Sequence, residues 1–242
     1  MQFTPWSEVQ KYNNVMPKNL HQESSWIRDL ILGGQDGLVN VLGIILGITA
    51  ANGTHPVIVA ASLAAAFAEA VSMGAVNYTS TLADRDHYEK EKNTELWEIE
   101  NEPDEEREEI RAIYSAKGFT GKELEMVVST ITRNKENWAN IMMEEELKVQ
   151  EVKTDKIISS SFLVGFSTVI GSLIPVLPYF ILQPHQALPV SLILSAMVLF
   201  GVGAYKAKTY VGSWWKSGVQ MLLIGMGAAI IGFIIGKFFR ID

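Results

Sequence analysis

Residues 27–51 have the sequence IRDLILGGQDGLVNVLGIILGITAA, an apolar run of 25 residues interrupted well inside by the carboxylate of Asp36. About 20 mainly apolar residues suffice for a helix that crosses the hydrocarbon core of a membrane. An ionised side chain inside such a helix is costly, and where it occurs it usually serves a function. The stretch therefore predicts a membrane-spanning helix with a functional acid at Asp36.

The same apolar pattern recurs along the chain, which has 242 residues and is 48% hydrophobic. Five segments are long and apolar enough to span a membrane: Ile27–Ala51, Pro56–Ala83, Ile157–Leu182, Ala187–Tyr205 and Gly218–Phe239. The predicted fold is therefore all-α, a polytopic membrane protein with five transmembrane helices. The first span lacks a basic start and a cleavage site, so we expect no signal peptide.

A polar insert separates the second span from the third. It divides the chain into a polar N-terminal arm (1–25), spans one and two (26–83), the insert (84–156) and spans three to five (157–242). The insert holds 21 acidic and 12 basic residues, a balance of −9 in a chain whose net charge is −7. We predict that it is an acidic three-helix domain that binds metal.

Helical patterns in the insert give its expected elements. The second span should continue to about Asn101, followed by a helix from Pro103 to Ala116 and two further stretches that begin with a capping box at Thr120. Apolar residues at helical spacing predict a small shared core of Ile110, Ile113, Leu124, Val127, Val128, Ile131 and Trp138.

Charge placement predicts the orientation in the membrane. The connections at 52–55 and 183–186 carry no Lys or Arg, whereas the other side collects Lys11, Lys18, Arg28, Lys206, Lys208 and Lys216. By the positive-inside rule, the N-terminus and the insert are expected in the cytoplasm. The acidic insert disfavours nucleic acid as a partner. The absence of cysteine excludes disulfides, thiolate metal ligands and thiol catalysis.

Two acids are predicted to share one depth in the membrane. At about 1.5 Å per residue, Asp36 lies roughly 12 Å from the inner edge, and Glu69 lies roughly 20 Å from the outer edge of a core about 30 Å thick. Asn40 follows Asp36 by one turn, and Met73 and Asn77 follow Glu69 on one helical face. These five residues are a candidate transport path. The alternative is a hydrogen-bonded pair that only holds helices together.

The insert carries pairs of acids spaced three apart, a spacing that directs two carboxylates toward one point. Because Met142 and Met143 are adjacent, they cannot both face the same core, and we expect at least one to be exposed or to be a ligand. A solvated acidic face and ordinary packing are the alternatives. The candidate metal ligands are Glu95, Glu98, Glu106, Glu109, Met142, Met143 and Glu146.

The donor types favour one kind of metal chemistry. Carboxylates and thioethers without thiolates or a histidine cluster favour exchangeable binding of first-row divalent ions. The chain has no Glu-x-x-His pair, nucleophile, base pair or cofactor motif, so we expect no enzyme and no cofactor. Glycines spaced four apart predict close helix packing or dimerisation, and they occur at Gly33 and Gly37, Gly43 and Gly47, and Gly232 and Gly236.

Four short motifs occur together in this chain. They are Arg28-Asp29-x-Ile31 followed by Asp36-Gly37-Leu38, Ser72-Met73-Gly74 with Tyr78, Asp86-His87-Tyr88, and Trp138 followed by Met142-Met143 and Glu146. With them the chain resembles the vacuolar iron transporter family from Trp26 to the carboxyl terminus. The resemblance implies a homodimer with five spans and a cytoplasmic metal-binding domain, which exports ferrous iron from the cytosol against protons.

By this resemblance, Asp36 is the translocation carboxylate, Met73 is the pathway methionine, and the seven candidate ligands of the insert bind the ion in the cytoplasm. The chain departs from plant-like members at Ala65, where they have a glutamate, and its own acid is Glu69, one turn nearer the cytoplasm. We expect Glu69 to take the place of that glutamate, because it lies on the same face of the helix.

The expected cargo is Fe2+, with Mn2+, Co2+ or Zn2+ as alternatives, because these donors discriminate little among first-row ions. A membrane-anchored metal sensor or store is the alternative of another class. Expected partners are a second copy of the chain, the lipid bilayer, divalent ions and protons. The short arm without a targeting sequence favours a prokaryotic cytoplasmic membrane over a vacuolar-type membrane.

Overall fold

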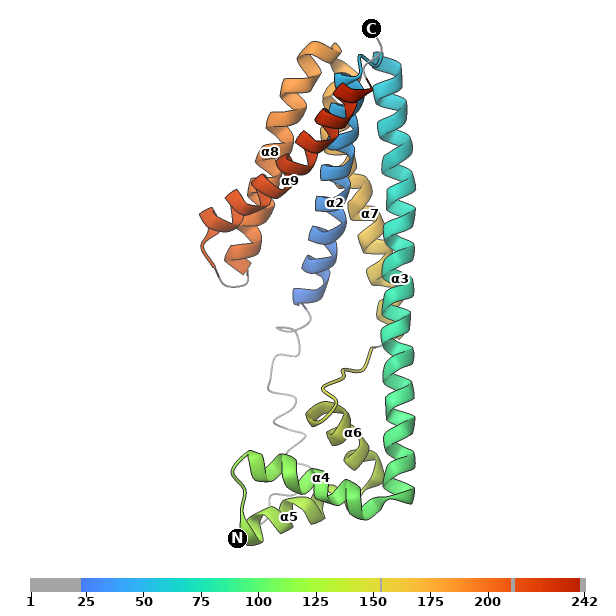
Figure 1. Ribbon diagram of the computed structural model, residues 1–242, viewed down its shortest axis with the longest axis vertical. Coiled ribbons are helices and arrows are strands. Elements are labelled where there is room, and N and C mark those ends of the chain that lie inside the picture. The colour runs from blue at the N-terminus through green and yellow to red at the C-terminus, as the bar shows by residue number, and fades with distance from the viewer. Residues whose placement is uncertain (1–22, 153, 210–211, 240–242) are drawn as a thin grey trace. The chain divides into compact units, whose positions relative to one another are not determined.

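All elements in the described residues of the computed structural model are α-helices (Figure 1). The described ranges are 23–152, 154–209 and 212–239, so the predicted polar arm lies almost wholly outside them. The helices are α2 (Glu23–Ala50), α3 (His55–Asn101), α4 (Pro103–Ala116), α5 (Gly121–Ile131), α6 (Lys135–Glu145), α7 (Thr154–Ile181), α8 (Pro184–Thr209) and α9 (Trp214–Phe238).

Five of these helices, α2, α3, α7, α8 and α9, are long and apolar enough to cross a membrane, which confirms the five predicted spans. Helix α3 runs unbroken for 47 residues. It therefore confirms that the second span continues to Asn101. The lengths follow from continuous apolar runs, which need about 20 residues to cross the hydrocarbon.

The chain forms two compact units. The first, which we call the membrane unit, contains the described residues up to Asn77 and from Ser159 onward. The second, which we call the acidic unit, is Tyr78–Ile158. Helix α3 contributes to both. The predicted ranges 26–83, 84–156 and 157–242 divide the chain in a similar way, and they stay predictions.

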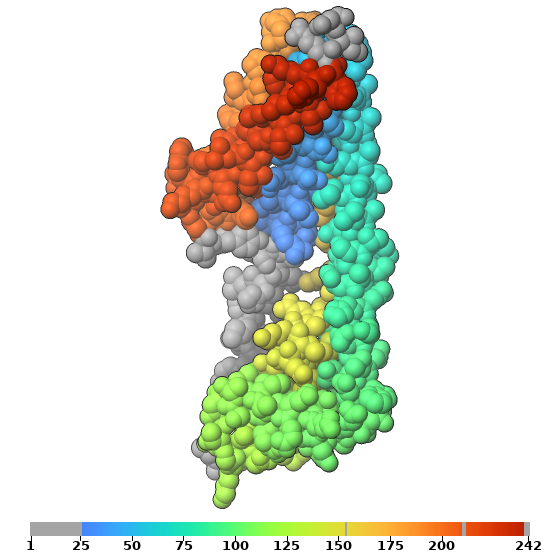
Figure 2. All heavy atoms as spheres, viewed as in Figure 1, coloured from blue at the N-terminus to red at the C-terminus, as the bar shows by residue number. Residues whose placement is uncertain are grey.

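Glycine determines how α2 and α9 pack in the membrane unit. Figure 2 shows α9, in red, lying along α2, in blue. A Cβ atom added at Gly232 would overlap the carbonyl oxygen of Gly43, and one added at Gly236 would overlap that of Gly47. The two glycine pairs therefore serve packing within one chain, since side chains there would force the backbones apart.

The acidic unit has the small core that the helical spacing predicted. The cluster contains all seven predicted residues, together with Ile99, Ala139 and Met142 among the buried ones. Helix α4 ends where Gly118 adopts a φ of +98°, a conformation that favours glycine. The capping-box prediction is wrong in part. Thr120 is the N-cap of α5, but its side chain makes no capping hydrogen bond.

Candidate functional site

A groove on the membrane unit is lined by α2, α3 and α9. Its volume is about 850 Å³, and its polar lining residues are Asp36, Asn40 and Glu69. The remaining lining consists of glycines and apolar side chains. Along α2 the lining runs from Asp36 to Ile48, which is about 18 Å of helix at 1.5 Å per residue, and it continues to Ala51, just past the end of the helix. The groove is therefore a long apolar surface with one polar end.

The polar end joins two helices. Asn40 Nδ2 of α2 donates a hydrogen bond of 2.5 Å to Glu69 Oε1 of α3. The second oxygen, Glu69 Oε2, is buried without a hydrogen-bond partner among the described residues. The Asp36 carboxyl group lies close enough to Glu69 to interact with it directly. The structure thus brings together three of the five path residues, and the common depth of Asp36 and Glu69 in a membrane stays a prediction.

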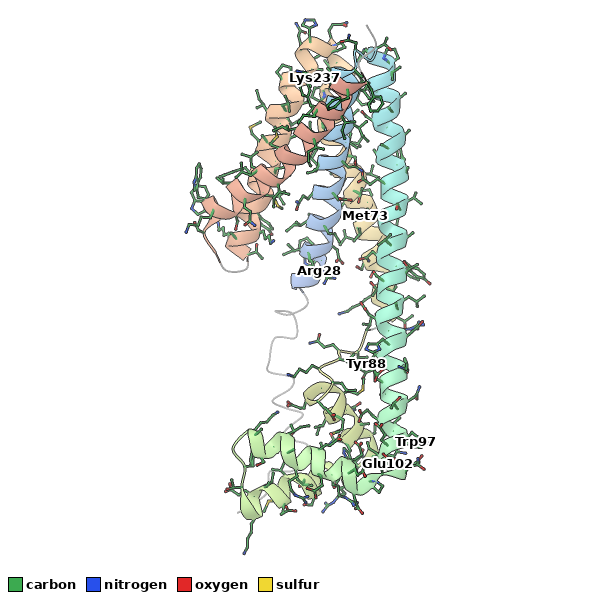
Figure 3. The ribbon with its side chains drawn as sticks, viewed as in Figure 1. Arg28, Met73, Tyr88, Trp97, Glu102 and Lys237 are labelled. Carbon is green, nitrogen blue, oxygen red and sulfur yellow. The ribbon has the colours of Figure 1, made fainter. Side chains whose placement is uncertain are left out.

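The other two predicted path residues lie outside the groove lining. Met73 is half-buried on α3, one turn beyond Glu69 (Figure 3). Asn77 Nδ2 donates hydrogen bonds to Ser160 Oγ at 3.0 Å and to Ser161 Oγ at 3.3 Å. The Asn77 amide is therefore turned toward α7. A role for Met73 and Asn77 on the path stays a prediction.

The structure adds one buried acid that sequence reasoning quoted only as part of a motif. Asp29 on α2 is 3% exposed, and its Oδ2 accepts a 2.6 Å hydrogen bond from Ser160 Oγ of α7. The neighbouring Arg28, labelled in Figure 3, is 3.4 Å from the other oxygen and is itself mostly exposed. The rule that singled out Asp36, an acid within an apolar span, would have found Asp29 as well.

Two glutamates of the acidic unit are buried. Glu95 and Glu106 are each 5% exposed, and each has one carboxylate oxygen, Oε2, without a hydrogen-bond partner among the described residues. Burial raises the pKa of Glu95 to about 7 and that of Glu106 to about 8. Nearby carboxylates add to both shifts, and they come from Glu98, Glu109 and Glu146.

The five predicted acids of this unit therefore lie within electrostatic reach of one another. Burial is also the main reason that the pKa values of Glu98 and Glu146 are raised, with Glu109 contributing to each. Within the described residues, however, no group of three or more His, Asp or Glu side chains is already arranged as a metal site. The five carboxylates are therefore near one another, but they are not arranged as a complete coordination sphere.

Both methionines of the predicted ligand set are buried. Met142 is 0% exposed and Met143 is 1% exposed. Neither is exposed, so of the two expected alternatives, exposure or ligation, only ligation remains, and it stays a prediction. Met142 packs into the core with Ile110 and Trp138. Since adjacent residues point about 100° apart on a helix, α6 must be covered over a wide arc.

Comparisons with known proteins match nearly the whole chain. The family model described as "VIT family" matches residues 27–237. The chain is 31% identical over 212 residues to vacuolar iron transporter 1 of Eucalyptus grandis, covering 87% of this chain and 85% of that protein.

Two further relatives give the same result. Vacuolar iron transporter 1 of Oryza sativa subsp. japonica is 32% identical over 212 residues, covering 87% of this chain and 84% of that protein. The vacuolar iron transporter of Plasmodium falciparum (isolate 3D7) is 28% identical over 229 residues, with coverage of 90% and 84%. The range that the family model matches includes the acidic unit and all groove-lining residues except Phe239.

Proposed function

The chain belongs to the VIT family, the family of the vacuolar iron transporters, and from that premise we propose that it exports ferrous iron from the cytosol in exchange for protons. The supporting observation is the meeting of Asp36 from α2 and Glu69 from α3 in one groove, where Asn40 donates a hydrogen bond to Glu69. Helices that only anchor a domain do not need a pair of acids inside the membrane.

The pair suggests how metal and proton movement are coupled. Two carboxylates this close repel each other when both are ionised, and a low dielectric strengthens the repulsion. Either protons or a divalent cation can neutralise the pair. If protons replace the ion on the far side and the ion replaces protons on the cytosolic side, the two move in opposite directions.

Other groups would complete the path. Because Asn40 donates through Nδ2, its carbonyl oxygen Oδ1 is available as a neutral ligand. Met73, one turn beyond Glu69, offers a soft thioether that favours first-row ions over magnesium or calcium. Asn77 lies a further turn along α3. These donors suit an ion that binds and leaves, since none of them is a thiolate.

The acidic unit is proposed to capture the ion in the cytoplasm. A divalent cation would compensate the buried charge of Glu95 and Glu106 and would contact their unpartnered oxygens. Binding requires neighbouring side chains to converge on the ion, and it displaces protons from the ligands. The proposed ligands are Glu95, Glu98, Glu106, Glu109, Met142, Met143 and Glu146.

A second copy of the chain is proposed to cover the groove. Asp36 is exposed in the single chain, and the groove is open along α2 and α9. A carboxylate facing lipid is costly. A homodimer that meets along this groove would replace lipid with protein at Asp36 and would enclose the path between two subunits.

Two alternatives are carried forward. The cargo could be Mn2+, Co2+ or Zn2+, because carboxylate and thioether ligands discriminate little among these ions. A metal sensor or store would use the acidic unit for binding and the helices only as an anchor. The paired acids in the groove favour transport over storage.

The decisive experiment is metal uptake into vesicles that contain the purified full chain, with an opposing pH gradient and a panel of Fe2+, Mn2+, Co2+ and Zn2+. Asp36→Asn and Glu69→Gln keep side-chain size and remove one charge each. We expect each to abolish both metal uptake and metal-dependent proton flux. Glu123→Gln makes the same chemical change on the exposed surface of α5 and should transport normally.

The outcomes separate the alternatives. Normal proton-coupled uptake by Asp36→Asn would overturn the proposed mechanism. Metal binding by the full chain without any uptake would favour the sensor or store. The ion with the highest ratio of maximal rate to half-saturating concentration identifies the preferred cargo.

The orientation and the compartment are proposals of the same kind. We propose a cytoplasmic N-terminus and acidic unit, and a prokaryotic cytoplasmic membrane. Because the chain has no cysteine, single cysteines introduced at the exposed positions Thr54 and Asn93 can be labelled from each side of sealed vesicles. Labelling of both positions from the same side would overturn the orientation.

A further inference from the structure

A chain of hydrogen bonds links three helices of the membrane unit. Asn77 Nδ2 of α3 donates to Ser160 Oγ of α7 at 3.0 Å, and Ser160 Oγ donates to Asp29 Oδ2 of α2 at 2.6 Å. Ser160 is thus acceptor and donor at once, as a hydroxyl can be. The last acceptor is a buried carboxylate, which makes that bond charge-assisted and shorter than a neutral one.

Helix α7 supports both α2 and α3 through small residues. A Cβ atom added at Gly33 would overlap the carbonyl oxygen of Val164, and one added at Gly37 would overlap that of Thr168. On the α3 side, a Cβ atom at Gly74 would lie 3.2 Å from the carbonyl oxygen of Ser161. Glycine has no side chain that interlocks with a neighbouring helix. These contacts therefore set how close α2 and α3 lie to α7, and they do not by themselves set the axial register.

The chain of hydrogen bonds fixes the axial positions of α2 and α3 relative to α7. Asp29 precedes Asp36 by seven residues, about two turns or 10 Å on nearly the same line of α2. Asn77 follows Glu69 by eight residues, about 12 Å along α3. Both α2 and α3 are therefore hydrogen-bonded to the same helix, α7. Each bond lies about two turns away from the groove acid that the helix carries.

We propose that Asp29, Ser160 and Asn77 form a positioning device that sets the register of α2 and α3, and through it the alignment of Asp36 and Asn40 with Glu69. The inference rests on the proposed transport function. Asp29 acts through Ser160 and does not line the groove. In this proposal Asn77 positions α3 through its hydrogen bond to Ser160 and does not contact the ion.

The first test uses transport kinetics of the full chain in vesicles. Ser160→Ala removes both bonds made by Ser160 and leaves the 3.3 Å bond from Asn77 to Ser161 Oγ. Asp29→Asn weakens the charge-assisted bond while preserving shape. Since misplacement of reacting groups by about 1 Å can cost up to 10²-fold, we expect the maximal rate to fall about tenfold or more, with little change in the half-saturating metal concentration. Ser160→Thr restores the hydroxyl and should recover the rate. Ser115→Ala, the same change at an exposed position of α4, is the control.

The second test measures geometry without transport. The cysteine-free chain permits spin labels at Leu32→Cys on α2 and Val71→Cys on α3, two exposed positions in the membrane unit. The labelled chain is diluted with unlabelled chain, so that only distances within one chain are measured. Ser160→Ala should shift or broaden the α2–α3 distance distribution, and Ser160→Thr and Ser115→Ala should leave it unchanged.

The two tests keep this inference separate from the proposed function. An unchanged rate and an unchanged distance distribution in both Ser160→Ala and Asp29→Asn overturn the positioning device. A lower melting temperature with unchanged rate and distance also overturns it, because the network would then only add stability. If the parent chain moves no metal, the proposed function fails, and the distance measurement still decides whether the network sets the register.

Discussion

Asn40 on α2 donates a 2.5 Å hydrogen bond to Glu69 on α3, although 29 residues separate them in the sequence. The bond joins the first two spans next to Asp36. The other Glu69 oxygen, Oε2, is buried and has no hydrogen-bond partner within the part of the chain that the structure describes. Asn40 therefore orients Glu69 through one carboxylate oxygen, and the other oxygen is available to bind a cation.

The Asn40 donor is the first target for mutation. Asn40→Ala removes the hydrogen bond to Glu69 Oε1, and an intramolecular hydrogen bond contributes about 0.5–1.5 kcal/mol to stability. We expect a lower melting temperature and a metal uptake rate reduced at least about tenfold. Asn93→Ala, on an exposed part of α3, should change neither. Uptake at the parental rate in Asn40→Ala would show that Glu69 needs no positioning by this bond.

The acidic unit should respond to pH between about 4.5 and 8. The pKa of Glu95 is raised to about 7 and that of Glu106 to about 8, from an ordinary value of 4.5, mainly by burial. In this interval the folded unit binds more protons than the unfolded chain does. Its free energy of unfolding should therefore be greatest near pH 4.5 and fall as the pH rises toward 8.

Metal affinity should change in the opposite direction. Divalent ions compete with the same protons, so calorimetric titration of the full chain should show affinity rising at least about tenfold from pH 5.5 to 8. The double variant Glu95→Gln/Glu106→Gln should flatten this dependence. Glu125→Gln, which changes an acid paired with Arg111, should preserve it. Equal affinity at both pH values in the parent would contradict the involvement of Glu95 and Glu106.

The buried methionines permit packing and ligation to be separated. Met142→Leu and Met143→Leu nearly conserve volume, so each should cost less than about 1.5 kcal/mol of stability. Each removes a thioether, and we expect weaker binding of Fe2+ and Co2+ by the full chain. Met126→Leu, at an exposed position of α5, is the control. Unchanged affinity in both variants would leave these methionines with a packing role alone.

The α2–α9 contact predicts opposite results for two glycines of one helix. Gly236→Ala places a methyl group against the carbonyl oxygen of Gly47, and overpacking of this kind costs about 1–3 kcal/mol. Gly227→Ala meets nothing within 4 Å. There the better helix propensity of alanine should add stability of up to about 1 kcal/mol. Thermal unfolding in detergent measures both, and equal effects would contradict the close packing.

Much of the fold could be predicted because the signals are local. Apolar runs of sufficient length gave the five spans, and helical spacing gave the core of the acidic unit around Ile110 and Trp138. Positions of helix ends followed from Pro103 and Gly118. The fixed rise per residue predicted similar depths for Asp36 and Glu69, and the structure brings both residues into one groove.

The sequence by itself determined which segments are helices, how far along its helix each acid lies, and which residues carry charge or a thioether. The tertiary structure alone decided that Asn40 meets Glu69, that Ser160 joins Asp29 to Asn77, and that Met142 and Met143 are both buried. The reason is geometric. Depth and periodicity are properties of one helix, whereas the rotation of a helix about its axis and its choice of neighbours depend on side chains far away in the sequence.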